Sequence, residues 1–196
     1  MLTSIFQSKK LLIACAIKIC AWSTTGFCDD DYQNCLDRYS LDNHVNVSSL
    51  ESLANNGDIE ARYCLGVIYH DGKGVKRDLR LAIDWYAQAG QKGHVEAQYW
   101  LCLMYRDGIG IESSALESMY WCKRAAKQNH ANALYALGQL YYGGIHPNRL
   151  VNAHIWFTRA KEAGEMSAMA MINLIEKQMT DLQIREAKKL RLQDEL

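Results

Sequence analysis

The sequence predicts an all-α protein, an α/α superhelical solenoid built from helix-turn-helix repeats. The main observation is a set of like residues that recur at a constant spacing of 36 residues: Ala61, Ala97 and Ala133; Tyr63, Tyr99 and Tyr135; Leu65, Leu101 and Leu137. Each unit contains two amphipathic runs, which indicates helical pairs that bury their apolar faces only against neighbouring pairs. The chain of 196 residues has one proline and no useful alternation of Val, Ile and Thr, which argues against a sheet.

The composition is that of an ordinary globular protein, with 49% hydrophobic and 22% charged residues. The formal net charge is zero, and acidic and basic residues are interspersed along the chain. A protein that binds nucleic acid would carry a basic stripe. We therefore expect no nucleic-acid partner.

The first residues are arranged like a secretory signal peptide. Lys9 and Lys10 precede an apolar run over residues 11–22, and small or polar residues follow at positions 23–26. A retained membrane span needs about 20 apolar residues, so this run is too short to cross a bilayer as a helix. The sequence predicts a signal peptide over residues 1–28 and a periplasmic or secreted protein.

Other short signals keep alternative locations open. Lys18 interrupts the apolar run, as in an amphipathic cytosolic N-terminus, and residues 12–15 fit the lipobox spacing of bacterial lipoproteins. The C-terminal residues 193–196 are similar to an ER-retention tetrapeptide, and residues 46–48 form a glycosylation sequon. Ser48 is also explained as half of a helix capping box with the glutamate three residues later. We rank the lipoprotein and the ER lumen below export to the periplasm.

Residues 29–60 predict a degenerate N-terminal capping repeat. Its first helix is expected over residues 29–39 and its second over residues 48–55. The turn at 55–58 copies the turn at 91–94, which ends the following repeat. The segment is shorter than a full period, which suits a cap.

Three full repeats follow, over residues 61–96, 97–132 and 133–167. Gly72 and Gly108 are expected to end the first helices, because glycine accepts the positive φ of a helix exit. Asp78 and Ser114 are expected to cap the second helices. His94 and His130 lie at equivalent turns one period apart and are interpreted as loop residues.

The later part of the chain departs from the strict period. Trp85 and Trp121 keep the spacing of 36, whereas Trp156 follows at 35, because the third repeat loses a residue in its loop over 142–147. The tryptophans are interpreted as packing residues. Residues 168–196 predict a C-terminal capping helix that is solvated at its end.

The seven cysteines support export. Cleavage after Cys28 would leave Cys35, Cys64, Cys102 and Cys122, and an even number suits a disulfide framework in an oxidising compartment. We expect Cys102 to bridge Cys122, and Cys35 to bridge Cys64 at like positions of adjacent first helices. A bridge from Cys28 to Cys35, or four buried free thiols, are the alternatives.

The expected bridge in the middle repeat rests on where its two cysteines fall in the period. Cys102 stands where the other repeats have Gly66 and Gly138, at the closest approach of the two helices of a pair. Cys122 takes the place of Tyr86 on the second helix. A bridge between them would join the two helices of one repeat.

The pattern A-x-Y-x-L-G-x-x-Y-x-x-G-x-G-V, followed by A-x-x-W-Y-x-x-A and a G-x-x-x-A ending, resembles the Sel-one-like repeat, a relative of the tetratricopeptide repeat. The resemblance covers residues 61–164, with departures at Cys102, Ser118 and the loop at 143–147. It implies a superhelical scaffold, often exported in bacteria, that holds a protein partner on its concave face. Such proteins include immunity proteins that neutralise toxins of type VI secretion loci, so a secreted toxin and an envelope protein are the candidate partners.

By this resemblance, the concave face is drawn from alternate turns of the first helices. The residues expected to bind a partner are Tyr63, His70, Asp71, Tyr99, Arg106, Asp107, Tyr135, Gln139 and Tyr142. Tyrosine suits recognition because it offers contact area and a hydroxyl at low entropic cost. The three tyrosines that recur are equally explained as part of the repeat's own packing, whereas His70, Arg106 and Tyr142 vary between units and carry more information.

The chain lacks the usual signatures of catalysis and metal binding. Some cysteine-rich relatives are described as β-lactamases or penicillin binders, but no serine here is followed by lysine three residues on. No Cys-x-x-Cys or His-x-x-x-His occurs, so no zinc site is expected. We predict a non-enzymatic binding protein without cofactor or metal. The alternatives are an enzyme acting on β-lactams or penicillin-like substrates and a quality-control adaptor of the ER lumen.

Overall fold

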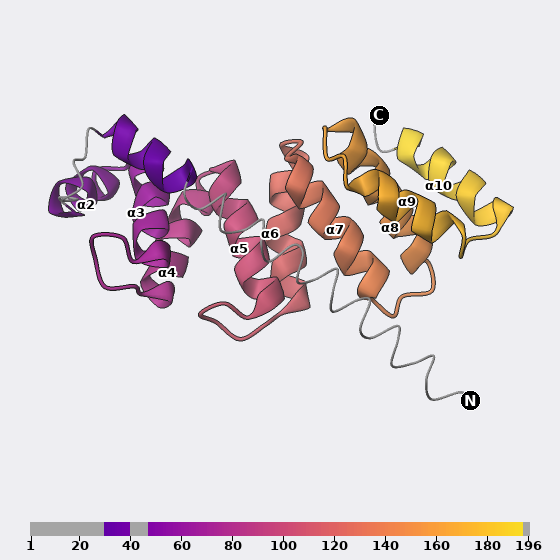
Figure 1. The fold of residues 1–196 in the computed structure, drawn as a ribbon, viewed down its shortest axis with the longest axis horizontal. Helices are drawn as coiled ribbons and strands as arrows, with labels where there is room; N and C mark the ends of the chain where they lie inside the picture. Colours follow the sequence, from indigo (N-terminus) through magenta and orange to yellow (C-terminus); the bar gives the residue numbers. More distant parts are fainter. Residues whose placement is uncertain (1–29, 40–46, 194–196) are drawn as a thin grey trace. The chain divides into compact units, whose positions relative to one another are not determined.

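The structure, a computed structural model, describes residues 30–39 and 47–193, in which every regular element is an α-helix (Figure 1). The predicted all-α class is confirmed. The predicted signal peptide, the sequon's Asn46 and the last three residues of the chain lie outside the described residues. The chain forms two compact units, residues 1–78 and 79–196. Among the described helices, none combines the length and apolar content needed to cross a bilayer.

Unit 1 contains a helix over residues 30–38, α2 (Val47–Asn55) and α3 (Ile59–Asp71). Helix α2 packs on α3. The Arg62 guanidinium donates to the backbone oxygen of Ala54 at 2.9 Å, and the Tyr69 hydroxyl donates to Glu51 at 3.2 Å. Helix α2 begins at Val47, so Ser48 lies inside its first turn. A capping box would instead place Ser48 just before the helix.

Unit 2 contains seven helices in the described residues: α4 (Leu79–Gln91), α5 (Val95–Asp107), α6 (Ala115–Lys127), α7 (Ala131–Gly143), α8 (Arg149–Glu162), α9 (Ala168–Glu176) and α10 (Asp181–Gln193). Consecutive helices from α4 to α9 pack on one another, and α10 packs on α8. Helices α3, α5 and α7 are the first helices of the three repeats, and α4, α6 and α8 are the second. The expected N-cap of α6 is present, since the Ser114 side chain accepts the N–H of Glu117 at 3.3 Å.

The helix over residues 30–38 lies antiparallel to α3. Three contacts fix its direction from one end to the other: Tyr39 with Asp58, Cys35 with Cys64, and Tyr32 with Lys73. In unit 2, α5 and α7 instead run parallel, because Glu96 contacts His130 at their N-terminal ends and Arg106 contacts Gln139 toward their C-terminal ends. The expected bridge between Cys35 and Cys64 is present, with Cα atoms 5.5 Å apart, and it joins two antiparallel helices.

The turns that lead from a second helix to the next first helix share a backbone feature. One residue of positive φ occurs in each turn, at Gly57, Gly93, Asn129 and Gly164. In the first three of these turns the next residue caps the following helix: the side chains of Asp58, His94 and His130 each accept the backbone N–H three residues further on. The two histidines interpreted as loop residues are therefore helix N-caps.

The closest approach within a repeat is made by a glycine under an aromatic ring, or by a disulfide. In the third repeat, a Cβ added at Gly138 would lie 2.7 Å from the ring of Phe157. In the second repeat, Cys102 and Cys122 occupy these two positions and are bonded, with Cα atoms 5.1 Å apart. The buried Ser118 hydroxyl donates to the backbone oxygen of Cys102 at 2.8 Å, so two of the three departures from the repeat pattern lie at one contact.

The C-terminal segment forms two helices where a single capping helix was predicted. Helix α9 ends at Glu176, and α10 starts with a reciprocal capping box between Thr180 and Gln183. This Thr-x-x-Gln pattern is visible in the sequence and marks the break. A small apolar cluster of Val151, Ile155 and Ala187 holds α10 on α8.

Candidate protein-binding face

The residues predicted to bind a partner fall in both units, and those of unit 1 are largely covered. Tyr63 is only 4% exposed. The side chains of His70 and Asp71 are 11% and 8% exposed, and they contact each other at 3.0 Å. Lys73 adds an ion pair to Asp71 at 3.6 Å while lying over the ring of Tyr32. This set packs inside unit 1, which favours the packing interpretation for Tyr63.

In unit 2 the predicted residues form a part-exposed surface along α5 and α7. We call it the α5–α7 face: Tyr99, Arg106, Asp107, Tyr135, Gln139 and Tyr142. Two guanidinium nitrogens of Arg106 donate to the Asp107 carboxylate at 2.8 Å each, and a third donates to Gln139 at 3.1 Å. A planar guanidinium with this many fixed partners has little freedom left to lose. Arg106 is therefore held in place while a quarter of its side chain remains in solvent.

A histidine links the same two helices at their N-terminal ends. The His130 Nδ1 accepts the N–H of Ala133 at 3.1 Å, so the ring proton is on Nε2, which donates to Glu96 at 3.1 Å. The ring of Tyr99 lies 4.7 Å from the His130 ring, centroid to centroid. The predicted binding residues did not include His130, although its recurrence one period after His94 was a visible signal.

The pKa of Glu96 reflects this arrangement. Burial acts to raise the pKa of its carboxyl, but the hydrogen bond from His130 and the electrostatic influence of the His130 and His94 rings outweigh burial. The pKa of Glu96 is therefore held below its usual range. Glu96 is ionised at neutral pH, and its side chain is 37% exposed.

The remaining predicted residues point to different neighbours. The Tyr142 hydroxyl accepts a hydrogen bond from Gln178 at 3.1 Å, and the Arg149 guanidinium lies 5.5 Å from the centre of its ring. Tyr135 packs edge-on against Phe157 at 5.1 Å between centroids. The structure thus brings Arg106, Asp107 and Gln139 into contact, while Tyr142 faces the C-terminal helices.

The chemistry of this face is that of recognition. It offers aromatic area, an oriented guanidinium, a carboxylate and an amide, with no nucleophile beside a general base. Among the residues the structure describes, no group of three or more His, Cys, Asp or Glu could hold a metal ion. The surface can form directional hydrogen bonds and apolar contacts with another macromolecule.

The model of the Sel1 repeat matches residues 59–94, 95–130 and 131–165, more than half of the chain. The chain belongs to the Sel1 repeat family. Each matched unit begins where a first helix begins, two residues before the predicted repeat boundary. The family fold is a protein-interaction scaffold, and Sel1 repeat proteins are generally non-enzymatic.

Two solved structures share the fold. A Sel1 repeat protein from Oxalobacter formigenes is 29% identical, with a TM-score of 0.58, and the match covers 74% of this chain and 59% of that one. The protein c5321, a protective antigen of uropathogenic Escherichia coli strains with an SLR fold, is 27% identical with a TM-score of 0.63. That match covers 74% of this chain and 32% of that one. The predicted solenoid of Sel-one-like repeats is therefore confirmed.

A search of curated proteins found no match. The chain spans about three fifths of the Oxalobacter protein and a third of c5321. The Sel1 repeats and the fold are therefore what the comparisons establish for this chain.

Proposed function

We propose that this Sel1 repeat protein is a non-catalytic binding protein of the periplasm that holds a protein partner on the α5–α7 face. The observation that carries the proposal is the fixed, part-exposed group of Arg106, Asp107 and Gln139 across the two first helices. Side chains ordered before binding lose less entropy on association, so they favour affinity. Arginine and tyrosine are also enriched among the residues that dominate interface energies.

The two disulfides support a location outside the cytoplasm. Cys35–Cys64 lies in unit 1 and Cys102–Cys122 in unit 2. Structural disulfides persist in oxidising compartments such as the periplasm and are rare in the cytosol. The predicted signal peptide agrees with this location. So does the likeness to c5321, a protective antigen.

A crosslinking experiment tests the binding face. A photo-crosslinking phenylalanine analogue at position 99 should capture a partner in cells, and the same analogue at the exposed position 161 on α8 should not. With the captured partner purified, Arg106→Ala should weaken binding about tenfold or more, and Lys161→Ala should leave the affinity unchanged. Equal capture at both positions, or an unchanged affinity for Arg106→Ala, would contradict the proposal.

An immunity role against a secreted toxin remains a prediction within this proposal. It requires the captured partner to be a toxin whose activity the purified chain inhibits, and inhibition should weaken with Arg106→Ala in parallel with binding. A partner without toxic activity would leave a binding protein of another kind.

The enzymatic alternative has a simple test. The α5–α7 face has no activated nucleophile, so we expect the mature chain to hydrolyse nitrocefin no faster than buffer. Turnover above that background that is lost on denaturation would overturn the non-catalytic part of the proposal.

A further inference from the structure

A second exposed surface lies on α6, away from the α5–α7 face. Leu116 is 82% exposed and Tyr120 is 50% exposed, and they are four residues apart, on one side of the helix. The exposed Lys123 and Lys127 continue the same side. We call these four residues the α6 strip; it is apolar toward the start of the helix and basic toward its end.

The repeat supplies a counterpart of the α6 strip on α8. At the spacing of 35 that relates Trp121 to Trp156, its residues correspond to Val151, Ile155, Thr158 and Glu162. There, however, Val151 is only 2% exposed and Ile155 only 6%. The difference is α10, which lies over this side of α8.

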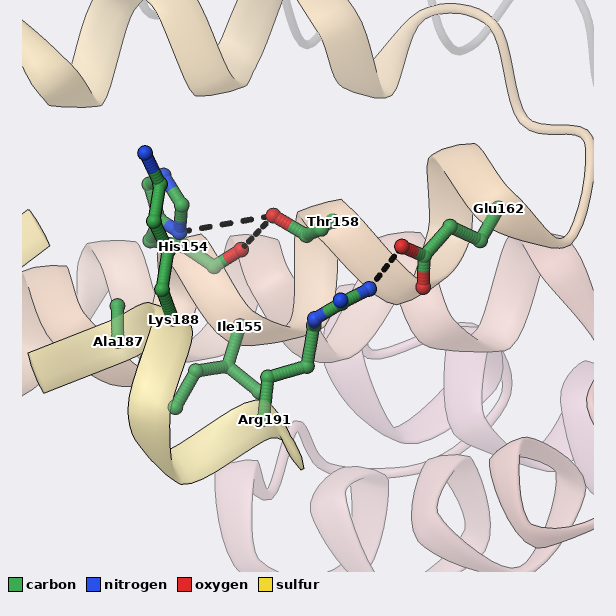
Figure 2. Close-up of a pocket in the computed structure, with 7 residues that line it drawn as sticks. All are labelled: His154, Ile155, Thr158, Glu162, Ala187, Lys188 and Arg191. Atoms are coloured by element: carbon green, nitrogen blue, oxygen red, sulfur yellow. Dashed lines mark hydrogen bonds and ion pairs between the residues drawn. The ribbon is translucent and has the colours of Figure 1, made fainter. Parts of the chain in front are cut away.

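The contact of α10 with α8 shows how a helix occupies such a strip. Ala187 packs into the cluster with Val151 and Ile155. Figure 2 shows Arg191 of α10 reaching Glu162 of α8, with which it forms an ion pair. Met179 packs at the start and Arg191 at the end, so α10 runs parallel to α8. A cavity of about 300 Å³ remains between them, lined in part by His154, Thr158 and Lys188.

We propose that the α6 strip binds an amphipathic helix of another protein, laid parallel to α6 as α10 lies on α8, with an acidic residue where α10 has Arg191. Apolar anchors on successive turns are how a helix docks on a partner helix. The charge follows from the substitution of Lys127 for Glu162, which reverses the sign at the end of the strip. Because this surface belongs to the second helix of its repeat, the inference goes beyond binding on the α5–α7 face.

Charge also decides against a second copy of this chain as the occupant. The α10 of another molecule would place Arg191 against Lys127, and like charges brought together at an interface suppress a wrong partner. A helix carrying glutamate or aspartate at that place would instead form an ion pair. The occupant is therefore a helix of a different protein.

The aromatic anchor is ordered before any partner arrives. Arg124 donates to the Tyr120 hydroxyl at 2.9 Å, and its guanidinium lies 5.5 Å from the centre of the Trp121 ring. A tyrosine held in one position loses little freedom when it becomes buried. The α6 strip thus presents a rigid ring beside the exposed Leu116.

A charge-swap experiment tests the proposal with two defined peptides. The first is the α10 segment, residues 177–193, and the second is the same peptide with Arg191→Glu; both are fluorescently labelled and titrated with the full mature chain. The Arg191→Glu peptide should bind at least about tenfold more tightly, because its glutamate pairs with Lys127 on α6, which repels the arginine of the first peptide. In the Lys127→Glu variant of the protein this preference should reverse.

Control variants separate the α6 strip from other surfaces. Leu116→Lys should abolish binding of the Arg191→Glu peptide, whereas Lys161→Glu, the same charge change as Lys127→Glu but on α8, should leave both affinities as they were. Arg106→Ala should also leave peptide binding intact, so this test and that of the α5–α7 face can fail separately. The proposal is wrong if neither peptide binds up to about 1 mM, if Leu116→Lys has no effect, or if Lys127→Glu does not reverse the preference.

Discussion

His130 shows how one residue of this repeat holds two helices at once. Its Nδ1 caps α7 and its Nε2 donates to Glu96 of α5, so both ring nitrogens are used in the neutral form. Aspartate does the first of these tasks in unit 1, where Asp58 caps α3. A histidine at this place adds a link to the preceding first helix, which aspartate, as an acceptor only, could not make to a carboxylate.

The Glu96→Gln variant should be less stable than the unchanged protein at neutral pH and equally stable in acid. The pKa of Glu96 is lowered in the folded chain, so its carboxylate stabilises the fold above the pKa of the unfolded chain, and this contribution is lost as pH falls through the folded pKa. With solvent screening of a part-exposed group, the difference at pH 7 should be about 1 kcal/mol. Urea unfolding of both proteins at pH 7 and near pH 3 measures it, with the exposed Glu112→Gln as control. A difference that grows in acid would contradict this assignment.

Asn129 is the one residue other than glycine with positive φ in the described part of the chain, at 60°. Asparagine tolerates this conformation better than other residues that carry a Cβ. We expect Asn129→Ala to destabilise the chain by about 1 kcal/mol and Asn129→Gly to be neutral within about 0.5 kcal/mol, because glycine relieves strain but frees the unfolded chain. At Gly93, where φ is 100° and a Cβ would meet nothing within 4 Å, alanine should also destabilise. Equal stabilities of the Ala and Gly variants at 129 would refute the conformational explanation.

At the scale of helix pairs, the closest contact has two solutions in this molecule. The third repeat places the Phe157 ring over Gly138, and the second replaces glycine and ring by the bonded Cys102 and Cys122. Each solution needs both of its residues, because a glycine without a ring leaves a cavity and a ring over a side chain clashes. The two positions should therefore be strongly coupled.

A double-mutant cycle tests this coupling. Cys102→Gly and Cys122→Phe alone should each cost more than about 2 kcal/mol, because each breaks the disulfide and mismatches the volume of the contact. The Cys102→Gly/Cys122→Phe double variant should recover at least about half of the summed loss, because it rebuilds the contact of the third repeat. Urea unfolding measures all four proteins. Simple additivity of the two losses would show that the positions do not share one packing solution.

The helices that the sequence predicted well are those repeated along the chain, because their glycine, alanine and aromatic positions are fixed by identical neighbours. The ends were predicted less well for the same reason. Nothing in the period encodes the direction of the helix over residues 30–38, which is set by its contacts with Asp58, Cys64 and Lys73. The break before α10 was readable from Thr180 and Gln183, but the charged pattern of the segment suggested one solvated helix.

The candidate binding residues show what a repeat pattern can and cannot supply. The period correctly identified equivalent positions, yet Tyr63 is buried in unit 1 while its counterpart Tyr99 is part-exposed in unit 2. Equivalent positions in the period therefore differ in their exposure to solvent. The contacts of Arg106 with Asp107 and Gln139 depend on side-chain geometry across two helices, which a one-dimensional pattern does not contain.

At the scale of the whole molecule, each of the two units is stabilised by its own disulfide. The bonded cysteines are separated by 29 residues in unit 1 and by 20 in unit 2. Closing loops of these sizes in the unfolded chain should stabilise the fold by about 3 kcal/mol for each disulfide.

In the mature protein purified from the periplasm, alkylation without reductant should modify none of these four cysteines, and alkylation after reduction in denaturant should modify all four. Reduction should lower the melting temperature by roughly 10–20 °C, since about 3 kcal/mol corresponds to several degrees in a chain of this size. A Cys35→Ser/Cys64→Ser variant should lose only the stabilisation that the unit 1 disulfide contributes. Its melting temperature should still fall on reduction, because the bridge between Cys102 and Cys122 remains. Thiols that are alkylated in the native, unreduced protein, or a melting temperature that does not respond to reductant, would remove the structural role of the disulfides and with it the main support for an oxidising compartment.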